Sequence, residues 1–346
     1  WTAKVRQKFQ NPKIICRSGP INHFYYLCRI YTMNLMKNSF HILFLCAALM
    51  PVCASLNSYA ASAVCATPAA SVEDDITASD NMLAADKYQE CRKILEGALP
   101  RAAEGHEKAE VLWRLARIQL IIGQNEPSKE SRRAIFGKGV SYAWEGVQQD
   151  GRNEKCYMWH CANVGRECQT RSLTEQVKAV PVMTDDLTKI LDVLGKVNYS
   201  EAWQALAEIY DKHPFKSDDC AINFARKAVD AADERTVGMS TWLLLARLLN
   251  ERGWSAEKRV GKAAEDREKF KSQTVPSEKY AYYDGSLDFN LKPRWSSKAL
   301  GSLSDREEAA ALVDYALALQ ARRTEKKTAL NADDVKALQA LRKEIK

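Results

Sequence analysis

A short helical motif that recurs four times constrains the fold of this chain more than any other feature of its sequence. Each copy has a large apolar residue, then an apolar residue or cysteine three positions later, directly followed by alanine. The copies are Leu112-x2-Leu115-Ala116, Met158-x2-Cys161-Ala162, Trp203-x2-Leu206-Ala207 and Trp242-x2-Leu245-Ala246. Positions i, i+3 and i+4 lie on one side of an α-helix, and a small residue there lets a second helix approach closely. The recurrence predicts stacked pairs of helices, with these residues packed between them.

The whole repeat region, residues 81–272, indicates helices only. Its apolar residues follow helical spacing, and the few prolines fall between the helical segments. Runs of alternating or β-branched residues, which are typical of strands, are missing. Ala221, Ala225 and Ala228 share one side of a helix, as expected for the second helix of a pair. We therefore predict an all-α fold, an α-solenoid of about four helix pairs.

The third copy of the motif extends to Tyr210, a further expected packing residue. It resembles the first helix of a tetratricopeptide repeat, W-x2-L-G-x2-Y, with Ala207 in place of glycine. The four copies start 46, 45 and 39 residues apart, whereas a regular repeat has about 34 residues. Loops or extra helical turns are therefore expected between repeats, most clearly at Gln169–Met183. The predicted fold is a tetratricopeptide-like α-solenoid, followed by an aromatic-rich loop and C-terminal capping helices in residues 273–346.

The N-terminal region has the layout of an export signal. Residues 36–60 have a basic start, an apolar run at Phe40–Val52 and a small-residue exit at Ser58-Tyr59-Ala60. We interpret residues 1–35 as upstream or mis-assigned sequence, because they show neither repeats nor helical spacing. Residues 61–80, rich in Ala, Ser, Thr and acidic residues, are predicted to be a flexible tether. The expected location is the periplasm or cell envelope; an uncleaved N-terminal anchor and a cytoplasmic extension are the alternatives.

The charge distribution argues against nucleic-acid binding. The chain carries 51 Lys and Arg and 44 Asp and Glu, a formal net charge of +7. Seven of the basic residues and none of the acidic ones precede residue 61, so residues 61–346 hold 44 of each sign. A neutral mature chain lacks the excess of positive charge with which proteins neutralise phosphates. We expect a protein partner or a small hydrophobic ligand, and no nucleic acid.

Four residues in the second repeat raise the question of a metal or thiol site: Cys156, His160, Cys161 and Cys168. On one helix Cys156 and His160 share a face, but Cys161 is turned away from Cys156, and Cys168 lies roughly 10 Å further along the axis. Closed zinc sites usually have closer cysteine pairs, and a buried cysteine packs as a small apolar residue. We therefore predict no metal, no cofactor and no catalytic residue. A thiol or metal enzyme is the weakest hypothesis.

The segment around the second repeat resembles a known family. The sequence CYMWHCANVGR at 156–166, followed by the helical stretch that leads into the third repeat, is similar to the exported tetratricopeptide proteins associated with TRAP transporters, the T component. The regulator-of-microtubule-dynamics proteins are similar over the same span, about residues 80–252. The resemblance implies a periplasmic helper that binds a solute-binding protein or a small hydrophobic ligand through a groove or pore. The T component is typically a lipoprotein, whereas Val52 precedes Cys53 here, so lipid anchoring is doubtful.

Three residues of this segment, Trp159, Asn163 and Arg166, are candidates for a ligand or partner groove. Asn and Arg on the inner helices of a solenoid can hydrogen-bond a peptide backbone or a carboxylate. The competing interpretation is that Asn163 and Gly165 only end a helix.

A second group of candidates lies in the aromatic segment after the repeats. Tyr280, Tyr282 and Tyr283, with Trp295, suit a lid or a partner surface, because aromatic residues are frequent at interfaces. An equally good interpretation is that the segment folds back and covers the array.

The expected function is non-covalent recognition in the cell envelope. The leading hypothesis is an accessory partner of a TRAP-type solute-uptake system, which predicts a groove or pore through the array. The alternative is a general envelope-assembly or peptide-binding scaffold, which predicts a continuous polar concave face. An enzyme would require Cys161 or Cys168 to be exposed beside His160.

Overall fold

The computed structural model of the chain describes residues 71–212, 218–283, 290–323 and 332–345. All regular secondary structure in these ranges is helical, and they contain no strand, which confirms the predicted all-α class. The predictions for residues 1–70, including the export signal and the start of the tether, lie outside the described residues.

The helices follow one another with short connections. Those of the repeat region are α4 (Val72–Ala84), α5 (Tyr88–Ala98), α6 (His106–Asn125), α7 (Lys129–Gln149), α8 (Glu154–Gln169), α9 (Leu173–Thr188), α10 (Ser200–Lys212), α11 (Asp218–Ala231) and α12 (Met239–Arg252). The later helices are α13 (Ala256–Ser272), α14 (Pro276–Tyr280), α15 (Asp305–Arg322) and α16 (Ala332–Ile345). Short 3-10 turns lie at Leu99–Arg101 and Leu300–Ser302, and a π-helical turn at Lys189–Val193 extends α9.

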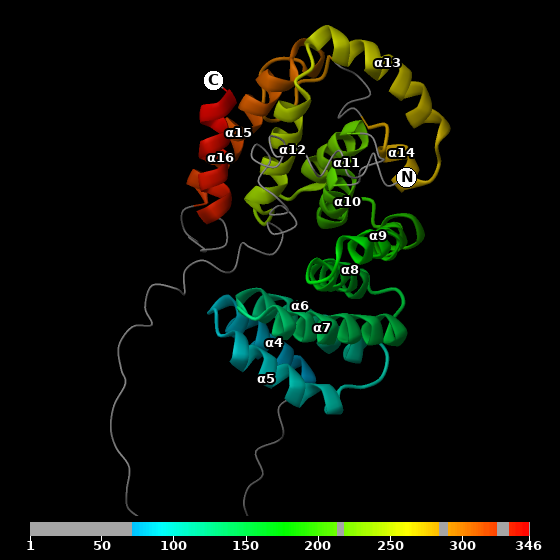
Figure 1. Ribbon diagram of the computed structural model, residues 1–346, viewed down its shortest axis with the longest axis vertical. Coiled ribbons are helices and arrows are strands. Elements are labelled where there is room, and N and C mark those ends of the chain that lie inside the picture. The colour runs from blue at the N-terminus through cyan, green and yellow to red at the C-terminus, as the bar shows by residue number, and fades with distance from the viewer. Residues whose placement is uncertain (1–70, 213–217, 284–289, 324–331, 346) are drawn as a thin grey trace, which may run out of the picture.

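Successive helices pack as pairs, and each pair stacks on the next. α4 packs on α5, α6 on α7, α8 on α9 and α10 on α11. The first helices of neighbouring pairs also touch, since α6 contacts α8 and α10 contacts α12. We call α6, α8, α10 and α12 the first-helix layer. This arrangement is the predicted α-solenoid, with α4–α7 at one end of the molecule and α12–α16 at the other (Figure 1).

The folded part begins earlier than the sequence predicts. Residues 72–80, expected to be tether, form most of α4. The Ser71 hydroxyl accepts a hydrogen bond from the Asp74 amide, and the Asp74 carboxylate accepts one from the Ser71 amide. This capping box satisfies amides that a helix start would otherwise leave without partners. Ile76 and Leu83 then pack against the apolar side chains of α5 and α6, so a segment with the composition of a tether folds.

The expected insertion at Gln169–Met183 consists mainly of helix. Ser172 and Glu175 form a capping box that starts α9. The helix then continues through Pro181, contrary to the expectation that prolines lie between segments. Proline lacks the amide that would bond the carbonyl of Val177 four residues earlier. Val177 itself is 48% exposed, so the proline lies on a part of α9 that borders solvent.

In a regular array, α12, the fourth repeat helix, would pair with the next helix in the chain. Here its partner lies further along the chain. α12 packs chiefly against α15, and α16 contacts both. α13 leads away in an arch across the end of the molecule (Figure 1). The apolar residues that α15 buries are Ala309, Leu312, Val313, Ala316 and Leu319. Those that α13 buries are Ala263 and Phe270, too few to cover α12. α15, predicted to be a cap, therefore completes the fourth pair, and α16 is the cap.

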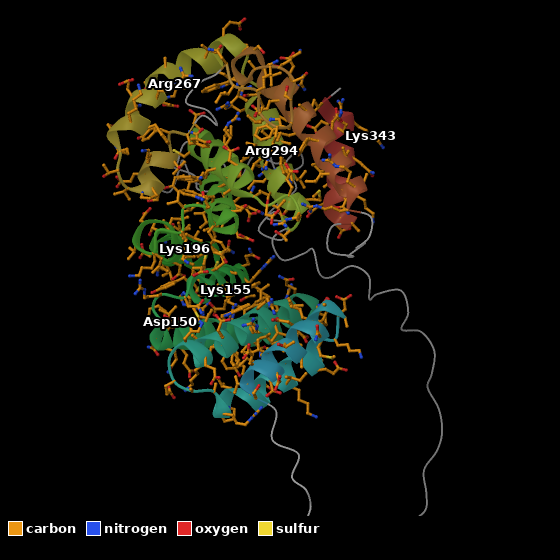
Figure 2. All side chains as sticks on the ribbon, turned by 180° about the vertical axis from the view of Figure 1, so that it is seen from behind. Asp150, Lys155, Lys196, Arg267, Arg294 and Lys343 are labelled. Carbon is orange, nitrogen blue, oxygen red and sulfur yellow. The ribbon has the colours of Figure 1, made fainter. Side chains whose placement is uncertain are left out.

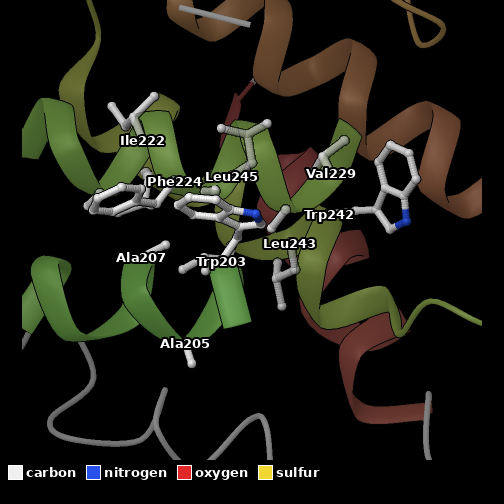
Figure 3. Close-up of a cluster of buried hydrophobic side chains, with 14 of the residues drawn as sticks. Trp203, Ala205, Ala207, Ile222, Phe224, Val229, Trp242, Leu243 and Leu245 are labelled. Carbon is white, nitrogen blue, oxygen red and sulfur yellow. The ribbon is translucent and has the colours of Figure 1, made fainter. Parts of the chain in front are cut away.

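The largest hydrophobic cluster centres on α10, α11 and α12. Trp203 and Trp242, from the third and fourth motif copies, are fully buried in it (Figure 3). Phe224 of α11 stacks on Trp203 with 5.7 Å between ring centres, and Tyr210 meets Phe224 edge-on at 5.0 Å. Apart from the half-buried Ala162 and Tyr210, the residues that define the four motif copies are buried.

A network of buried ion pairs fastens the C-terminal helices to the array. Glu308 of α15 receives two hydrogen bonds of 2.6 Å from Arg226 of α11 and one of 2.6 Å from Arg259 of α13. Asp305, at the start of α15, accepts hydrogen bonds of 2.8 and 2.9 Å from Arg252 of α12. Four helices are thus joined by charge as well as by apolar packing.

Candidate functional site

Two of the three groove candidates on α8 face the preceding helices. Trp159 is half-buried and packs against apolar side chains of α6 and α7. Asn163 is fully buried, and its amide donates to the backbone carbonyls of Ala116 at 3.1 Å and Trp159 at 2.8 Å. Asn163 therefore ties α8 to α6 and is not offered to an open groove. It does not end the helix either, since α8 continues to Gln169.

The third candidate, Arg166, turns toward α10. It is 4% exposed, and its Nη1 donates to Gln169 Oε1 at 3.1 Å. Its positive charge acts on the carboxyl of Glu208, a residue of α10. Of the three candidates, Arg166 is the one that reaches a polar cluster in the first-helix layer.

Polar side chains of α10 and α12 form this cluster through hydrogen bonds. The Oε1 atom of Gln204 accepts a hydrogen bond of 2.6 Å from the Thr241 hydroxyl. Its Nε2 donates to Ser240 Oγ at 3.3 Å and to Glu208 Oε1 at 3.2 Å. All four side chains are buried, so the bonds hold the Glu208 carboxyl in a fixed orientation.

An ion pair continues the cluster toward the ends of the two helices. Arg247 of α12 donates to Asp211 of α10 at 2.8 Å and to Glu251 at 2.8 Å. Gln204 meets Thr241 near the helix starts, and Asp211 meets Arg247 near the helix ends. α10 and α12 therefore run in the same direction and share one polar stripe.

The first turn of α16 brings a second buried carboxyl to α12. Asp334 is fully buried, and the backbone of Ser240, at the start of α12, contributes a hydrogen bond that lowers the pKa of its carboxyl against the effect of burial. Among the described residues none forms a hydrogen bond with the Oε2 atom of Glu208, although the positive charges of Arg166 and Arg247 act on this carboxyl. A buried acceptor without a donor is rare in native proteins, so this oxygen of Glu208 is unusual.

Burial raises the pKa of both carboxyls. At Glu208 desolvation is the largest influence, and it raises the pKa to about 8 against the opposing effects of Gln204 and Arg166. At Asp334 desolvation again comes first, and the negative charges of Asp333 and Glu208 add to the rise, to about 8. Both groups hold a proton near neutral pH, and buried carboxyls perturbed in this way often mark functional sites.

The aromatic segment after the repeats folds back onto the array. Tyr280 packs against Trp203 at 5.1 Å and Phe270 at 5.6 Å between ring centres. The Tyr283 hydroxyl donates a hydrogen bond of 2.5 Å to Asp230 of α11. These are the contacts of a segment that covers the array, the second of the two interpretations.

Tyr282 and Trp295 take different places in this segment. Tyr282 is half-buried, with the Lys269 ammonium 5.5 Å from its ring centre. Trp295 is buried and meets Trp242 edge-on at 6.2 Å. The guanidinium of Arg294, the residue before Trp295, lies 5.0 Å from the Trp242 ring centre. The start of the C-terminal region thus belongs to the core.

The thiols are placed poorly for nucleophilic chemistry. Cys161 and Cys168 are 1% and 7% exposed, so the exposure beside His160 that a thiol enzyme requires is missing. Burial raises the pKa of Cys156 to about 12 and that of Cys168 to about 11. Both therefore remain neutral thiols at physiological pH.

His160 forms a buried pair with Asp186 that ties α8 to α9. The His160 Nδ1 and Asp186 Oδ2 atoms are 2.7 Å apart. Burial raises the pKa of Asp186, and the hydrogen bond from His160 opposes that rise. Across the ranges that the structure describes, no group of three or more His, Cys, Asp or Glu side chains is arranged to hold a metal ion.

An open depression of about 420 Å³ lies between the α4–α5 turn and the end of α6. Its lining residues are Asp86, Lys87, Tyr88, Gln89, Glu90, Ile122, Asn125 and Glu126. Most of them are exposed, and none belongs to the predicted sites, so the polar cluster is the stronger candidate.

The sequence interpretation missed Gln204, Glu208 and Asp334. A signal for the first two was present, because with Asp211 they recur at i, i+4 and i+7 on the helix of the third motif copy. A polar stripe on a helix that is otherwise apolar indicates a buried polar cluster. Asp334 has no such signal, since an acidic residue in the first turn usually complements the helix dipole.

The charged side chains labelled in Figure 2 do not gather in one part of the surface. Lys155, Lys196, Arg267 and Lys343 lie on different elements along the length of the molecule (Figure 2). Among the described helices, none combines the length and apolar character of a membrane span.

Comparison with known families gives a match over part of the chain. Residues 75–194 match the model described as Regulator of microtubule dynamics protein 1-3. The match runs from α4 to just past the π-helical turn and includes α8. The resemblance to this family, expected from the sequence, is confirmed over that segment. A search of curated proteins finds no match.

Proposed function

We propose that this chain is a non-enzymatic binding scaffold of the cell envelope, an accessory partner of a TRAP-type solute-uptake system. Its partner would be the periplasmic solute-binding protein, or a small hydrophobic ligand. The observation that supports this most is the end of the polar stripe, where Arg247 pairs with Asp211 and with Glu251, whose side chain is 49% exposed. Stacked helix pairs present extended binding surfaces on such layers.

The match of residues 75–194 favours a second candidate. The name of the matched family refers to microtubule dynamics. A chain that shared that role would bind a cytoskeletal protein, and the matched part, α4–α9, would carry the contact. The two candidates therefore use different halves of the molecule, because the polar stripe lies on α10 and α12.

Affinity capture with the tagged full chain tests the proposal. An envelope extract and, separately, purified tubulin are passed over the immobilised protein, and bound proteins are identified by mass spectrometry. Recovery of a solute-binding protein or a transporter subunit as the main species is the expected result. Tubulin as the bound species would move the assignment to the second candidate. A mixture of assembly factors and unfolded proteins, or no bound protein, would contradict the accessory role.

Two variants test which half is used. Arg247→Gln removes a charge from the polar stripe, where Arg247 pairs with Asp211. Arg235→Gln removes a charge outside it: Arg235 lies in the connection before α12, and its side chain is 88% exposed. We expect Arg247→Gln to weaken capture and Arg235→Gln to leave it unchanged. Circular dichroism confirms that both variants fold.

A further inference from the structure

α16 continues the first-helix layer beyond α12 (Figure 1). The backbone of Ser240, in the first turn of α12, bonds the carboxyl of Asp334, in the first turn of α16. At the other end, Asn250 of α12 donates a hydrogen bond of 3.3 Å to Glu344 of α16. Both contacts join residues 94 positions apart, so the two helices run in the same direction and keep one register. α16 therefore takes the place of the first helix of a fifth pair.

The contact of α16 with the array depends on a short apolar stripe. Leu338, Leu341 and Ile345 are buried in the largest hydrophobic cluster, and the half-buried Val335 packs against it. Their spacing of three or four residues places them on one side of the helix. Most residues on the exposed side are polar. The part of α12 and α15 that α16 covers, which we call the cap surface, therefore fits an amphipathic helix.

α16 is held less firmly than α15. It buries three apolar side chains, whereas α15 buries five. Arg342 of α16 pairs with Asp314 of α15, but the two side chains are 33% and 55% exposed, and exposed pairs add little to stability. The buried Glu308, in contrast, fastens α15 to Arg226 and Arg259. We therefore expect α16 to separate from the array while α15 stays in place.

The first turn of α16 also buries an acidic residue in an unfavourable place. Asp334 is fully buried, and the negative charges of Asp333 and Glu208 oppose its ionisation. A helix with a neutral residue at this position would avoid that repulsion. The cap surface can therefore accept a tighter occupant than α16.

We infer that the cap surface is a binding site for an amphipathic helix of a partner polypeptide, and that α16 is the chain's own competitor for this site. Such a helix binds through apolar residues three or four positions apart. Departure of α16 also uncovers the start of the polar stripe, where Ser240 bonds Gln204 beside Glu208. The inference rests on the proposed binding function and names the kind of segment that is recognised.

Hydrogen exchange on the full chain tests whether α16 separates by itself. Backbone amides exchange when their helix opens, so those of α16 should exchange at least about tenfold faster than those of α15 under the same conditions. Equal rates in the two helices would overturn the inference, because α16 would then open only together with α15.

A labelled peptide tests the site itself. The probe has the sequence of residues 332–346 with Asp334→Asn, and its binding to the full chain is followed by fluorescence anisotropy. We expect a full-chain Leu338→Ala variant, whose own α16 is weakened, to bind the probe at least about tenfold more tightly than the unchanged chain. A control peptide with Leu338→Asp should bind neither protein. Equal affinity of the probe for variant and unchanged chain, or no binding to the variant, would overturn the inference.

Surface variants keep the test informative if Leu338→Ala fails to fold. Arg342→Asp in the full chain opposes Asp314 with a second negative charge and should tighten probe binding roughly three- to fivefold. Adding Asp314→Arg restores opposite charges within the chain and should remove that gain. Lys336→Ala, at a side chain 75% exposed, should change nothing. The same affinity in Arg342→Asp as in Lys336→Ala would contradict the competition.

These measurements need no envelope partner, so they are independent of the proposed function. If the probe fails to bind while the full chain captures the solute-binding protein, the helix site is wrong and the scaffold stands. If the probe competes with α16 while the full chain captures nothing, the helix site stands and the scaffold fails.

Discussion

Two buried glutamates, Glu208 and Glu308, differ in protonation because their partners differ. Both are withdrawn from solvent, and burial by itself raises the pKa of each. At Glu308 the charges and hydrogen bonds of Arg226 and Arg259 outweigh burial and lower the pKa. At Glu208 burial prevails. Glu308 is therefore an ionised structural tie, whereas Glu208 keeps its proton near neutral pH.

Replacing Glu308 by Ala should destabilise the protein strongly. The change leaves the guanidiniums of Arg226 and Arg259 buried without their carboxylate, and breaking a buried pair in this way costs about 3–5 kcal/mol. Asp314→Ala, which breaks an exposed pair with Arg342, should cost less than about 1 kcal/mol. Denaturant unfolding measures both. If the free energy of unfolding falls no more for Glu308→Ala than for Asp314→Ala, the buried ion-pair network contributes little to stability.

Asp334→Asn should flatten the pH dependence of stability. This carboxyl loses its proton near pH 3.8 in an unfolded chain, whereas burial raises its pKa to about 8 in the folded protein. Between these values the folded state binds a proton that the unfolded state has lost, so the free energy of unfolding falls as pH rises. Unfolding at about pH 5 and pH 8 should show a smaller fall in the variant. Equal falls in the two proteins would rule out a buried Asp334.

At the scale of elements, glycine sets how closely α7 approaches α8. A β-carbon at Gly139 would overlap the carboxamide of Asn163, which cannot move because it is buried and bonded to two carbonyls. A β-carbon at Gly137, two residues earlier on the same helix, meets nothing within 4 Å.

Alanine at these two positions should therefore have opposite effects. Gly137→Ala should stabilise the protein by roughly 0.5–1 kcal/mol, since alanine favours a helix over glycine. Gly139→Ala should destabilise it by about 1–3 kcal/mol, because overpacking outweighs that gain. Thermal or denaturant unfolding distinguishes them. Stabilisation by both would mean that α7 and α8 are further apart than described.

Sequence spacing predicts the existence of helices better than their boundaries and partners. The motif copies at 112, 158, 203 and 242 identify first helices because small and large residues alternate on one side. α4 was missed because its composition resembles a tether, although Ser71 and Asp74 have the spacing of a capping box. The contact of Asn163 with α6 was not predicted, because a polar residue in a helix can face a neighbouring backbone as well as solvent.

At the scale of the whole molecule, the order of the chain differs from the order of packing. α12 is covered by α15, more than fifty residues after it, because α13 carries too few apolar side chains. The local spacing of apolar residues does not indicate which later helix packs on α12, because that depends on which helix buries more apolar surface. The polar cluster depends on the same arrangement, since Asp334 reaches α12 through α16.

We propose that the first-helix layer around α10 and α12 recognises a polypeptide partner. A photo-crosslinking residue at Glu251, at the end of α12 with a side chain 49% exposed, tests it directly. The matched position is Glu268 on α13, outside the layer, with a side chain 76% exposed. After capture from an envelope extract, we expect a covalent adduct with the solute-binding protein from position 251 and none from position 268. An adduct from position 268 alone would contradict it.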